Sequence, residues 1–196
     1  SSTNSVLNAI NVNSMFPHKL ALAADLRGIN IIQIATDCVY SGSEGLYNEY
    51  SLHDATDVYG KTKSLGEVKM DNVYNLRCSI IGPERGANKS LLEWVLHQPQ
   101  DATINGYTNH LWNGVTTHAF AKLCYGVIKD GHSLNSSTHI VPADIVSKYE
   151  LLQIIANSYG RKDIKVTPAE APTEINRTLK TKSVRSEERR VGKECR

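Results

Sequence analysis

The chain has 196 residues and a formal net charge of +2, with 40% hydrophobic and 21% charged residues. These proportions are typical of a soluble globular protein, and no apolar run approaches membrane-spanning length, so we expect no membrane partner. The surplus charge comes from residues 185–196, which hold five Lys and Arg and three Glu. The rest of the chain is neutral, which argues against a nucleic-acid partner.

The cysteines in the body of the chain are Cys38, Cys78 and Cys124, which lie on apolar segments. Their separations do not match the ligand spacing of a metal site. We therefore expect reduced, buried thiols and no bound metal, as in a cytoplasmic protein. The absence of a visible secretory signal at the first residues favours the same location.

Residues 6–28 show a helical pattern of apolar residues, interrupted by Pro17. Because proline lacks the amide proton that an inner helical turn requires, we expect a helix start or a kink there. Gly28 is suited to a C-cap, where a left-handed backbone is common. The isoleucine-rich run that follows predicts a strand over residues 30–35, buried on both faces.

The predicted strand leads into Thr36 and Asp37, and a loop rich in Gly, Ser and Asn then reaches Tyr59 and Lys63. Tyr59 and Lys63 lie near the start of a helix predicted over residues 58–71, where positions four apart share a face. Thr36 would stand at the carboxyl end of its strand, the edge at which open α/β sheets bind ligands. An alcohol, a phenol and an ammonium group at one edge form a workable set for reducing a carbonyl.

Reduction of a carbonyl requires a proton donor, because hydride addition leaves an alkoxide. A free tyrosine has a pKa of about 10. A lysine cation nearby favours the phenolate and lowers that pKa. The spacing alone is weak support, since Tyr125 and Lys129 repeat it within an amphipathic helical pattern. Ordinary packing and a solvated lysine explain that second pair.

The remaining segments alternate between strand and helix. A strand over residues 73–81 ends at the Gly-Pro pair that follows it, and capping-box patterns begin at Ser90 and Ser147. Further short strands are predicted over residues 102–107, 138–141 and 163–166. Repeated strand–helix units predict an α/β fold. We expect a partial Rossmann-type parallel sheet with helices on both faces, plus part of a small C-terminal substrate domain.

We expect residues 1–100 to form the C-terminal part of a dinucleotide-binding domain, and residues 101–184 to form a substrate-binding portion. The amphipathic helix at residues 117–130 is expected to pack back on the first domain. Trp112 stands in a polar turn, where it could contact a ligand or fill the seam between the domains. Trp94 lies on an apolar helical run and is expected in the core.

The segments ATDCVYSGSEGLYNEY and DVYGKTKSLGE resemble the signature of the extended short-chain dehydrogenases/reductases. In that signature a Thr-Asp strand end precedes a helix that begins with Tyr-Gly-x-Ser/Thr-Lys. Among these proteins the chain is most similar to the dTDP-4-dehydrorhamnose reductase group. The likeness runs from about Asn8 to about Gly160 and also includes VNSMFPHKLA, LRCSIIGPE, SLLEWVL and GYTNHLWNGVTT. Tyr40 stands where the family commonly has Phe.

This resemblance implies roles for individual residues. Thr36, Tyr59 and Lys63 correspond to the catalytic triad, and Tyr59 and Lys63 would also contact an NADPH or NADH cofactor. Asn13 corresponds to a helix asparagine that supports the lysine through water. The loop that passes the nicotinamide would consist of Ser79, Ile80, Ile81 and Gly82. The expected substrate contacts are Thr36, Asp37, Glu49, Trp112 and Asn113, although Glu49 could equally cap its own loop.

Both ends of the chain depart from the family. Extended reductases begin with a glycine-rich turn that holds the cofactor pyrophosphate at a helix N-terminus, and no such motif precedes Thr36. Gly42 and Gly45 follow the strand and open no helix. We therefore expect an inactive fragment that lacks roughly the first 70–80 residues of the family and the end of the substrate domain. Residues 185–196 match a translated sequencing adapter and are expected to be non-native; a basic binding tail is the alternative.

The resemblance implies NAD(P)H-dependent reduction of a 4-keto-6-deoxy sugar nucleotide by a cytoplasmic protein that could form a homodimer. An epimerase or dehydratase of the same superfamily would require a further acid or base near Thr36, and only Asp37 is adjacent. A second alternative is a non-catalytic protein that resembles the regulatory subunit of methionine adenosyltransferase. The intact set of Thr36, Tyr59 and Lys63 disfavours that alternative, although fold likeness alone does not fix function.

Overall fold

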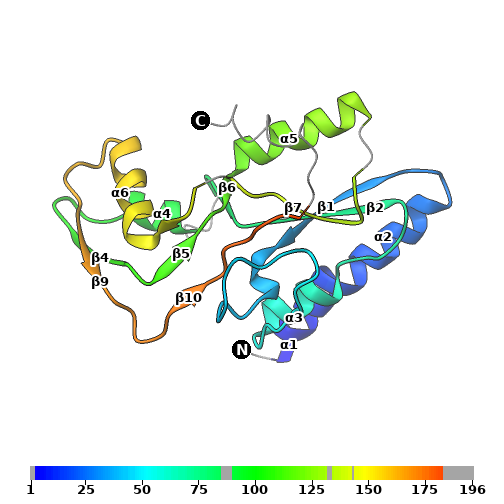
Figure 1. Ribbon diagram of the computed structural model, residues 1–196, viewed down its shortest axis with the longest axis horizontal. Helices are drawn as coiled ribbons and strands as arrows, with labels where there is room; N and C mark the ends of the chain where they lie inside the picture. Colours follow the sequence, from blue (N-terminus) through cyan, green and yellow to red (C-terminus); the bar gives the residue numbers. More distant parts are fainter. Residues whose placement is uncertain (1–2, 85–89, 132–133, 143, 183–196) are drawn as a thin grey trace.

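The computed structural model describes residues 3–84, 90–131, 134–142 and 144–182. The chain forms an α/β fold in two parts that lie side by side (Figure 1). The first part is built on a three-stranded parallel sheet of order β1-β2-β7. The predicted fold class is therefore confirmed. The tail expected to be non-native lies outside the described residues.

The N-terminal helical pattern gives α1 (Thr3–Ala9), a π-helical turn η1 (Ile10–Met15) and α2 (Phe16–Asp25). Pro17 occupies the first turn of α2, where a missing amide proton costs little. Gly28 follows the helix with a φ of +65°, as expected for a residue that ends it. The chain then enters β1.

β1 (Ile31–Thr36) pairs in parallel with β2 (Val73–Cys78), so that Thr36 lies opposite Cys78 at the carboxyl edge of the sheet. On its other side, β2 pairs with β7 (Ser137–His139). We expected the region that contains β7 to belong to a separate substrate-binding portion. The division near residue 100 is therefore too simple, because the chain returns to the first sheet after its excursion into the second part.

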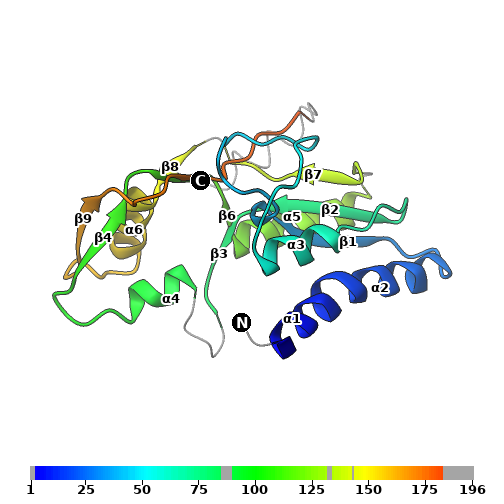
Figure 2. The same ribbon diagram turned by 90° about the horizontal axis from the view of Figure 1, so that it is seen from below.

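Helices cover both faces of this sheet (Figures 1 and 2). On one face, Ala21 of α2 packs with Val73. On the other face, Phe120 of α5 (Thr117–Asp130) packs with Leu76 and Cys78. Side chains alternate along β2, and this alternation sends its odd-numbered residues toward α2 and its even-numbered residues toward α5.

The second part contains three small sheets and two helices. β4 (Thr103–Tyr107) pairs in parallel with β9 (Lys165–Ala169), and β5 (His110–Trp112) lies between β10 (Ile175–Asn176) and the antiparallel β8 (Val146–Ser147). β3 (Ile80–Ile81) pairs with β6 (Val115–Thr116) and joins the two parts. With α4 (Leu91–Leu96) and α6 (Lys148–Ser158), they enclose a core of Leu92, Val95, Ile104, Leu151, Leu152, Ile155 and Ile164.

Several details differ from the sequence predictions. The last predicted strand begins later and continues through Pro168, which sits within β9. The capping box is complete at Ser147. At Ser90 only half of a box forms, because the Ser90 amide donates to Glu84 instead of Glu93. Trp94 is 42% exposed and not in the core, because Leu92 and Val95 occupy the inward side of α4.

Helix α3 (Val58–Leu65) lies directly against the short 3-10 turn η2 (Asp37–Val39) that follows β1. The Asp57 carboxylate caps α3 by accepting the amide proton of Gly60 at 2.9 Å. A methyl group on Gly60 would overlap the carbonyl oxygen of Cys38. The lack of a side chain at Gly60 is therefore what allows the helix to approach the turn.

The predicted helix over residues 58–71 stops at Leu65, six residues early. Gly66 ends it and lies against the backbone carbonyl of Asn13 in η1, where a β-carbon would also overlap. The Gln33 side chain then donates to the Gly66 carbonyl at 2.6 Å. Both ends of α3 are thus fixed by tertiary contacts of glycines, which outweigh the helical pattern beyond them.

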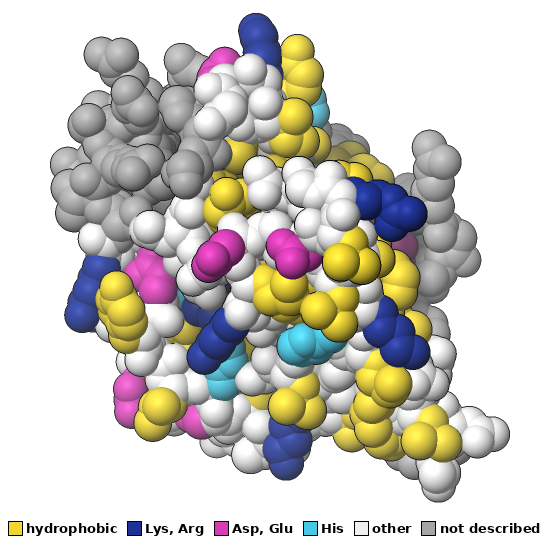
Figure 3. All heavy atoms as spheres, turned by 90° about the vertical axis from the view of Figure 1, so that its right-hand side faces the viewer, with side chains coloured by type: hydrophobic (Ala, Val, Ile, Leu, Met, Phe, Trp, Pro, Cys, Tyr) yellow, Lys and Arg dark blue, Asp and Glu magenta, His cyan; other side chains and the backbone are white. Residues whose placement is uncertain are grey.

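On the face shown in Figure 3, basic, acidic and apolar side chains are interspersed, and no single-sign patch forms there. Within the described ranges, no helix has the length and apolar character needed to cross a membrane. The same residues contain no group of three His, Cys, Asp or Glu side chains that could hold a metal ion.

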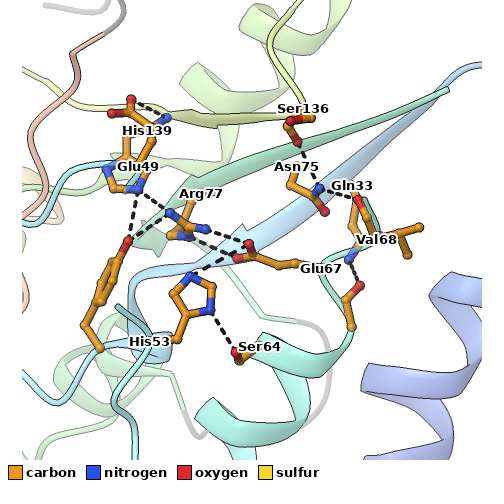
Figure 4. A network of polar contacts seen from close by, with 12 residues as sticks. Gln33, Glu49, His53, Ser64, Glu67, Val68, Asn75, Arg77, Ser136 and His139 are labelled. Carbon is orange, nitrogen blue, oxygen red and sulfur yellow. Dashed lines mark hydrogen bonds and ion pairs between the residues drawn. The ribbon is translucent and has the colours of Figure 1, made fainter. Parts of the chain in front are cut away.

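A buried polar network lies beneath the loop that leads to α3 (Figure 4). Its centre is Arg77 on β2, which is 2% exposed. Arg77 donates to both carboxylate oxygens of Glu67, at 3.0 and 2.6 Å, and to the Tyr40 hydroxyl at 2.9 Å. It also donates to Nε2 of His139. Tyr40, which replaces the common Phe of the family, thus supplies an acceptor that Phe could not.

The network fixes the protonation of His139. Arginine can only donate hydrogen bonds, so Nε2 of His139 must accept from Arg77. Nδ1 then carries the proton and donates to the Lys180 carbonyl at 2.9 Å. Burial lowers the pKa of His139 to about 4, and the Arg77 cation acts in the same direction. The ring is therefore neutral at physiological pH.

We predict that stability falls as pH falls from about 6.5 to about 4, because the unfolded chain binds a proton at His139 before the folded chain does. The difference between the folded pKa of about 4 and the ordinary pKa of 6.5 corresponds to roughly 3 kcal/mol in the free energy of unfolding. Urea unfolding of His139→Gln should show a flatter pH dependence over this window than the parent protein. His118→Gln, at an exposed position on α5, should retain the parent slope, and equal slopes in all three proteins would contradict the assignment.

We predict that Gly60→Ala destabilises the protein by about 1–3 kcal/mol, because the added methyl group overlaps the Cys38 carbonyl. Gly126→Ala on α5 is the matched control, since no atom lies within 4 Å of the added carbon. It should stabilise the protein by up to about 1 kcal/mol through helix propensity. Urea unfolding measures both, and a neutral Gly60→Ala would show that α3 can move away from η2 freely.

Candidate active site

The end of β1 presents two adjacent polar side chains to the sheet edge. Thr36 and Asp37 are each 8% exposed. The Thr36 hydroxyl oxygen accepts the Cys38 amide proton at 3.1 Å, which fixes its side chain at the start of η2. Burial raises the pKa of Asp37, while the hydroxyl of Ser79 and the charge of Arg177 oppose that rise.

Tyr59 and Lys63 are one turn apart on α3, and both face β1. The Tyr59 phenol lies close enough to Thr36 for that hydroxyl to affect its pKa. The Lys63 ammonium donates to the Ile34 carbonyl of β1 at 3.0 Å. The three residues that the sequence singles out are therefore gathered around the last residues of one strand.

The acidity of Tyr59 differs from the sequence expectation. Burial raises the pKa of Tyr59, and the neighbouring Cys38 and Asp37 add to that rise, while Thr36 opposes it. The Lys63 ammonium, one turn further along α3, is bound to the Ile34 carbonyl. In this arrangement Tyr59 is held in its protonated form and does not tend toward the phenolate.

A cavity of about 300 Å³ adjoins this group of residues, at the junction of the two parts. Ser79 connects the residues at the end of β1 with the cavity. Its hydroxyl lies beside Asp37 and accepts the indole proton of Trp112 at 2.9 Å. Trp112 lines the cavity and also packs against the core of the second part. The residues that line the cavity are Ser79, Ile80, Ile81, Gly82, Pro83, Glu84, Ser90, Leu91, Trp112, Thr117, Lys148 and Leu151.

The lining includes all four residues expected to contact a nicotinamide, from Ser79 to Gly82. It does not include Thr36, Tyr59 or Lys63. Asp37, beside Thr36, lies next to the lining residue Ser79. Gly82 lies so close to Thr117 that a β-carbon would overlap its side chain. This contact brings the start of α5 to the cavity wall.

Two of the expected substrate contacts lie elsewhere. Asn113 is 5% exposed, and its amide group donates to the Leu179 carbonyl at 2.7 Å and accepts the Leu179 amide proton at 2.9 Å. The Glu49 carboxylate accepts the amide protons of His139 and Lys182, at 3.2 and 3.1 Å. Neither residue lines the cavity. Both bind backbone of the C-terminal segment, and the partners of Glu49 lie 90 or more residues away rather than in its own loop.

Asn13 also makes a direct contact that differs from the role implied by the family. Its side-chain amide donates to the Thr62 hydroxyl at 3.1 Å, one residue before Lys63. Asn13 therefore fixes α3 against η1. The other tyrosine–lysine pair of the sequence, Tyr125 and Lys129, lies on the exposed side of α5, away from this group.

Sequence reasoning missed both charged residues of the cavity lining, Glu84 and Lys148. Lys148 is the one without a hydrogen bond to the residues that the structure describes. It directly follows the Ser147 cap of α6, and in the sequence it is indistinguishable from an ordinary lysine in a first helical turn. It reaches the cavity only because β8 pairs with β5 beside Trp112. No local pattern could have indicated that pairing.

Solved structures with the same fold come from sugar-nucleotide enzymes. The dTDP-4-dehydrorhamnose reductase of Clostridium acetobutylicum gives a TM-score of 0.74 and 23% identity, over 94% of this chain and 67% of that one. The Bacillus anthracis dTDP-4-dehydrorhamnose reductase, solved in complex with NADP, gives a TM-score of 0.75 and 18% identity, over 90% of this chain and 66% of that one. The dTDP-glucose 4,6-dehydratase DesIV of Streptomyces venezuelae, solved with NAD and TYD bound, gives a TM-score of 0.66 and 18% identity, over 92% of this chain and 62% of that one.

Identities at this level establish the shared fold. The chain spans about two thirds of the length of these reductases. No curated protein matches it. The family described as the RmlD substrate binding domain matches residues 3–188, which includes the first four residues of the tail that we expected to be non-native. The chain, matched over nearly its whole length, belongs to the RmlD substrate binding domain family.

Proposed function

We propose that this chain carries the catalytic groups of an NAD(P)H-dependent reductase of 4-keto-6-deoxy sugar nucleotides. The observation that carries the proposal is the approach of Tyr59 on α3 to Thr36 at the end of β1, with Lys63 bound to the same strand. An acid and a second hydroxyl near one point can receive a carbonyl oxygen. The similar reductases and the family membership support the same substrate class.

The residues present fit a nicotinamide cofactor in part. The Lys63 ammonium uses one hydrogen bond, to Ile34, so two protons remain for ribose hydroxyls. The segment from Ser79 to Gly82 lines the cavity and could contact a nicotinamide through its backbone. Gly42 and Gly45 instead pack on Arg177 and Asn176, and no glycine-rich turn opens a helix within the described ranges. Bound NAD(P)H would supply the hydride.

The roles of the side chains follow from their protonation and contacts. Tyr59 is protonated at neutral pH and would donate its proton to the carbonyl oxygen. The Thr36 hydroxyl would hold that oxygen by a hydrogen bond. Once Tyr59 has given up its proton, the Lys63 cation, one turn away, would stabilise the phenolate. Trp112 offers an aromatic face at the cavity wall for the sugar or the base.

A dehydratase is the second candidate, and the direction in which burial shifts the pKa of Asp37 favours it. Elimination of water requires an additional acid, and burial shifts Asp37 toward its protonated form beside Thr36. The similarity to DesIV is compatible with this alternative. A non-catalytic subunit has less support, since nothing in such a role requires Thr36 and Tyr59 to converge.

We predict that Tyr59→Phe lowers the rate of NADPH consumption with dTDP-4-keto-6-deoxy sugars by about 10²–10⁴-fold, because the proton donor is lost. NADPH affinity, measured by fluorescence titration, should change little. Tyr125→Phe makes the same chemical change at an exposed position and should retain full activity. The protein expressed from its complete gene is used throughout, and normal turnover by Tyr59→Phe would remove Tyr59 as the acid.

We further predict that the same protein reduces the 4-keto sugar nucleotide but does not convert dTDP-glucose in the presence of NAD⁺. Product formation is followed by nuclear magnetic resonance of the sugar carbons. Asp37→Asn, which keeps the hydrogen-bonding shape and removes the acid, should leave most of the reductase rate. Conversion of dTDP-glucose that disappears in Asp37→Asn would establish the dehydratase instead.

A further inference from the structure

Lys148 is a charged group at the cavity to which neither the family resemblance nor the proposed mechanism gives a role. It is the first residue of α6, directly after the Ser147 cap, and it lines the cavity together with Ser79 and Trp112. The charge of Asp37, at the end of β1, acts on the Lys148 ammonium, and Lys148 shares the cavity lining with Leu151 of the second part. The ammonium group is therefore placed at the boundary between the two parts of the chain.

Among the residues that the structure describes, none forms a hydrogen bond or ion pair with Lys148. Burial lowers the pKa of Lys148, the nearby Asp37 opposes that effect, and Arg177 reinforces it. A cation that is mostly removed from water and not hydrogen-bonded is destabilising unless something compensates it.

The position on α6 adds to this cost. The first turn of an eleven-residue helix carries partial positive charge, and a lysine there is repelled by it. Glu150 compensates only the helix end, because it is exposed and bound to Ser147 in the capping box. Glu84 also lines the cavity, but its carboxylate accepts the Ser90 amide proton at 2.9 Å. An anion in the cavity would offset both the repulsion and the lost hydration.

We propose that Lys148 binds the diphosphate of the nucleotide-sugar substrate and thereby sets the distance between the nucleotide and the reacting sugar. This inference rests on the proposed function. Lys148 lies near enough to Asp37 for that charge to act on it, and Asp37 accepts the Thr36 hydroxyl proton at 3.3 Å. With the sugar carbonyl at Thr36 and Tyr59, the diphosphate would extend along the cavity wall to Lys148. Lys148 is thus a positioning and specificity residue, not an acid or base.

The test compares binding of dTDP and of thymidine, which lacks the diphosphate, by isothermal titration calorimetry. The proteins are the parent, Lys148→Met, Lys148→Arg and the control Lys129→Met, which removes an exposed lysine from α5. Each is expressed from the complete gene. For Lys148→Met we expect dTDP to bind at least about tenfold more weakly, while thymidine affinity is unchanged. Lys148→Arg and Lys129→Met should bind dTDP like the parent.

A second reading is that Lys148 serves only as a counter-charge to Asp37. In that case Lys148→Met would lower the melting temperature and leave dTDP affinity at the parent value, which would overturn the proposal. Equal weakening of dTDP and thymidine would overturn it as well. These binding measurements involve no hydride transfer, so absence of reductase activity in the parent would reject the proposed function without deciding the role of Lys148.

Discussion

The candidate site depends on one close approach, in which helix α3 lies with Gly60 against the Cys38 carbonyl of η2. Any larger residue at Gly60 would hold the helix farther from the end of β1. Tyr59 precedes this glycine, and Thr36 lies two residues before the carbonyl. The contact that excludes a side chain is therefore the contact that brings phenol and alcohol together. Gly66 performs the equivalent function at the other end of α3, against η1.

The candidate site also requires that the loop between β1 and α3 be held in one position by buried contacts. Arg77 supplies these contacts, since its guanidinium joins Glu67, Tyr40 and His139 within the fold. A buried ion pair with complete hydrogen bonding contributes little net stability but strongly penalises alternative arrangements of its partners. The network therefore specifies where the loop lies more than it strengthens the fold. Tyr59, the proposed acid, lies on the helix that this loop leads into.

The sequence predicted the parts of the site that depend on local pattern. The run into Thr36 and the four-residue spacing of Tyr59 and Lys63 are short-range signals, and the structure brings these residues together. The predicted substrate contacts Asn113 and Glu49 lie away from the cavity, and the sequence did not indicate Lys148. Asn113 and Glu49 bind backbone near residues 179–182, and Lys148 reaches the cavity through a strand pairing. Such contacts join segments that are far apart in the chain, so local patterns such as hydrophobic periodicity or helix caps cannot predict them. The early end of α3 has the same cause, since the pattern beyond Leu65 is helical but the tertiary contacts of Gly66 prevail.

The C-terminal segment has a consequence for the order of folding. Leu46 binds Thr178, and Glu49 binds Thr181, across a separation of 132 residues in each case. Closing so long a loop is entropically slow, and contacts of this kind form late. During synthesis on the ribosome, the contacts of this loop with residues 178–182 cannot form until nearly all of the described chain has emerged. The loop between β1 and α3 therefore acquires its full set of contacts only as translation of this region finishes.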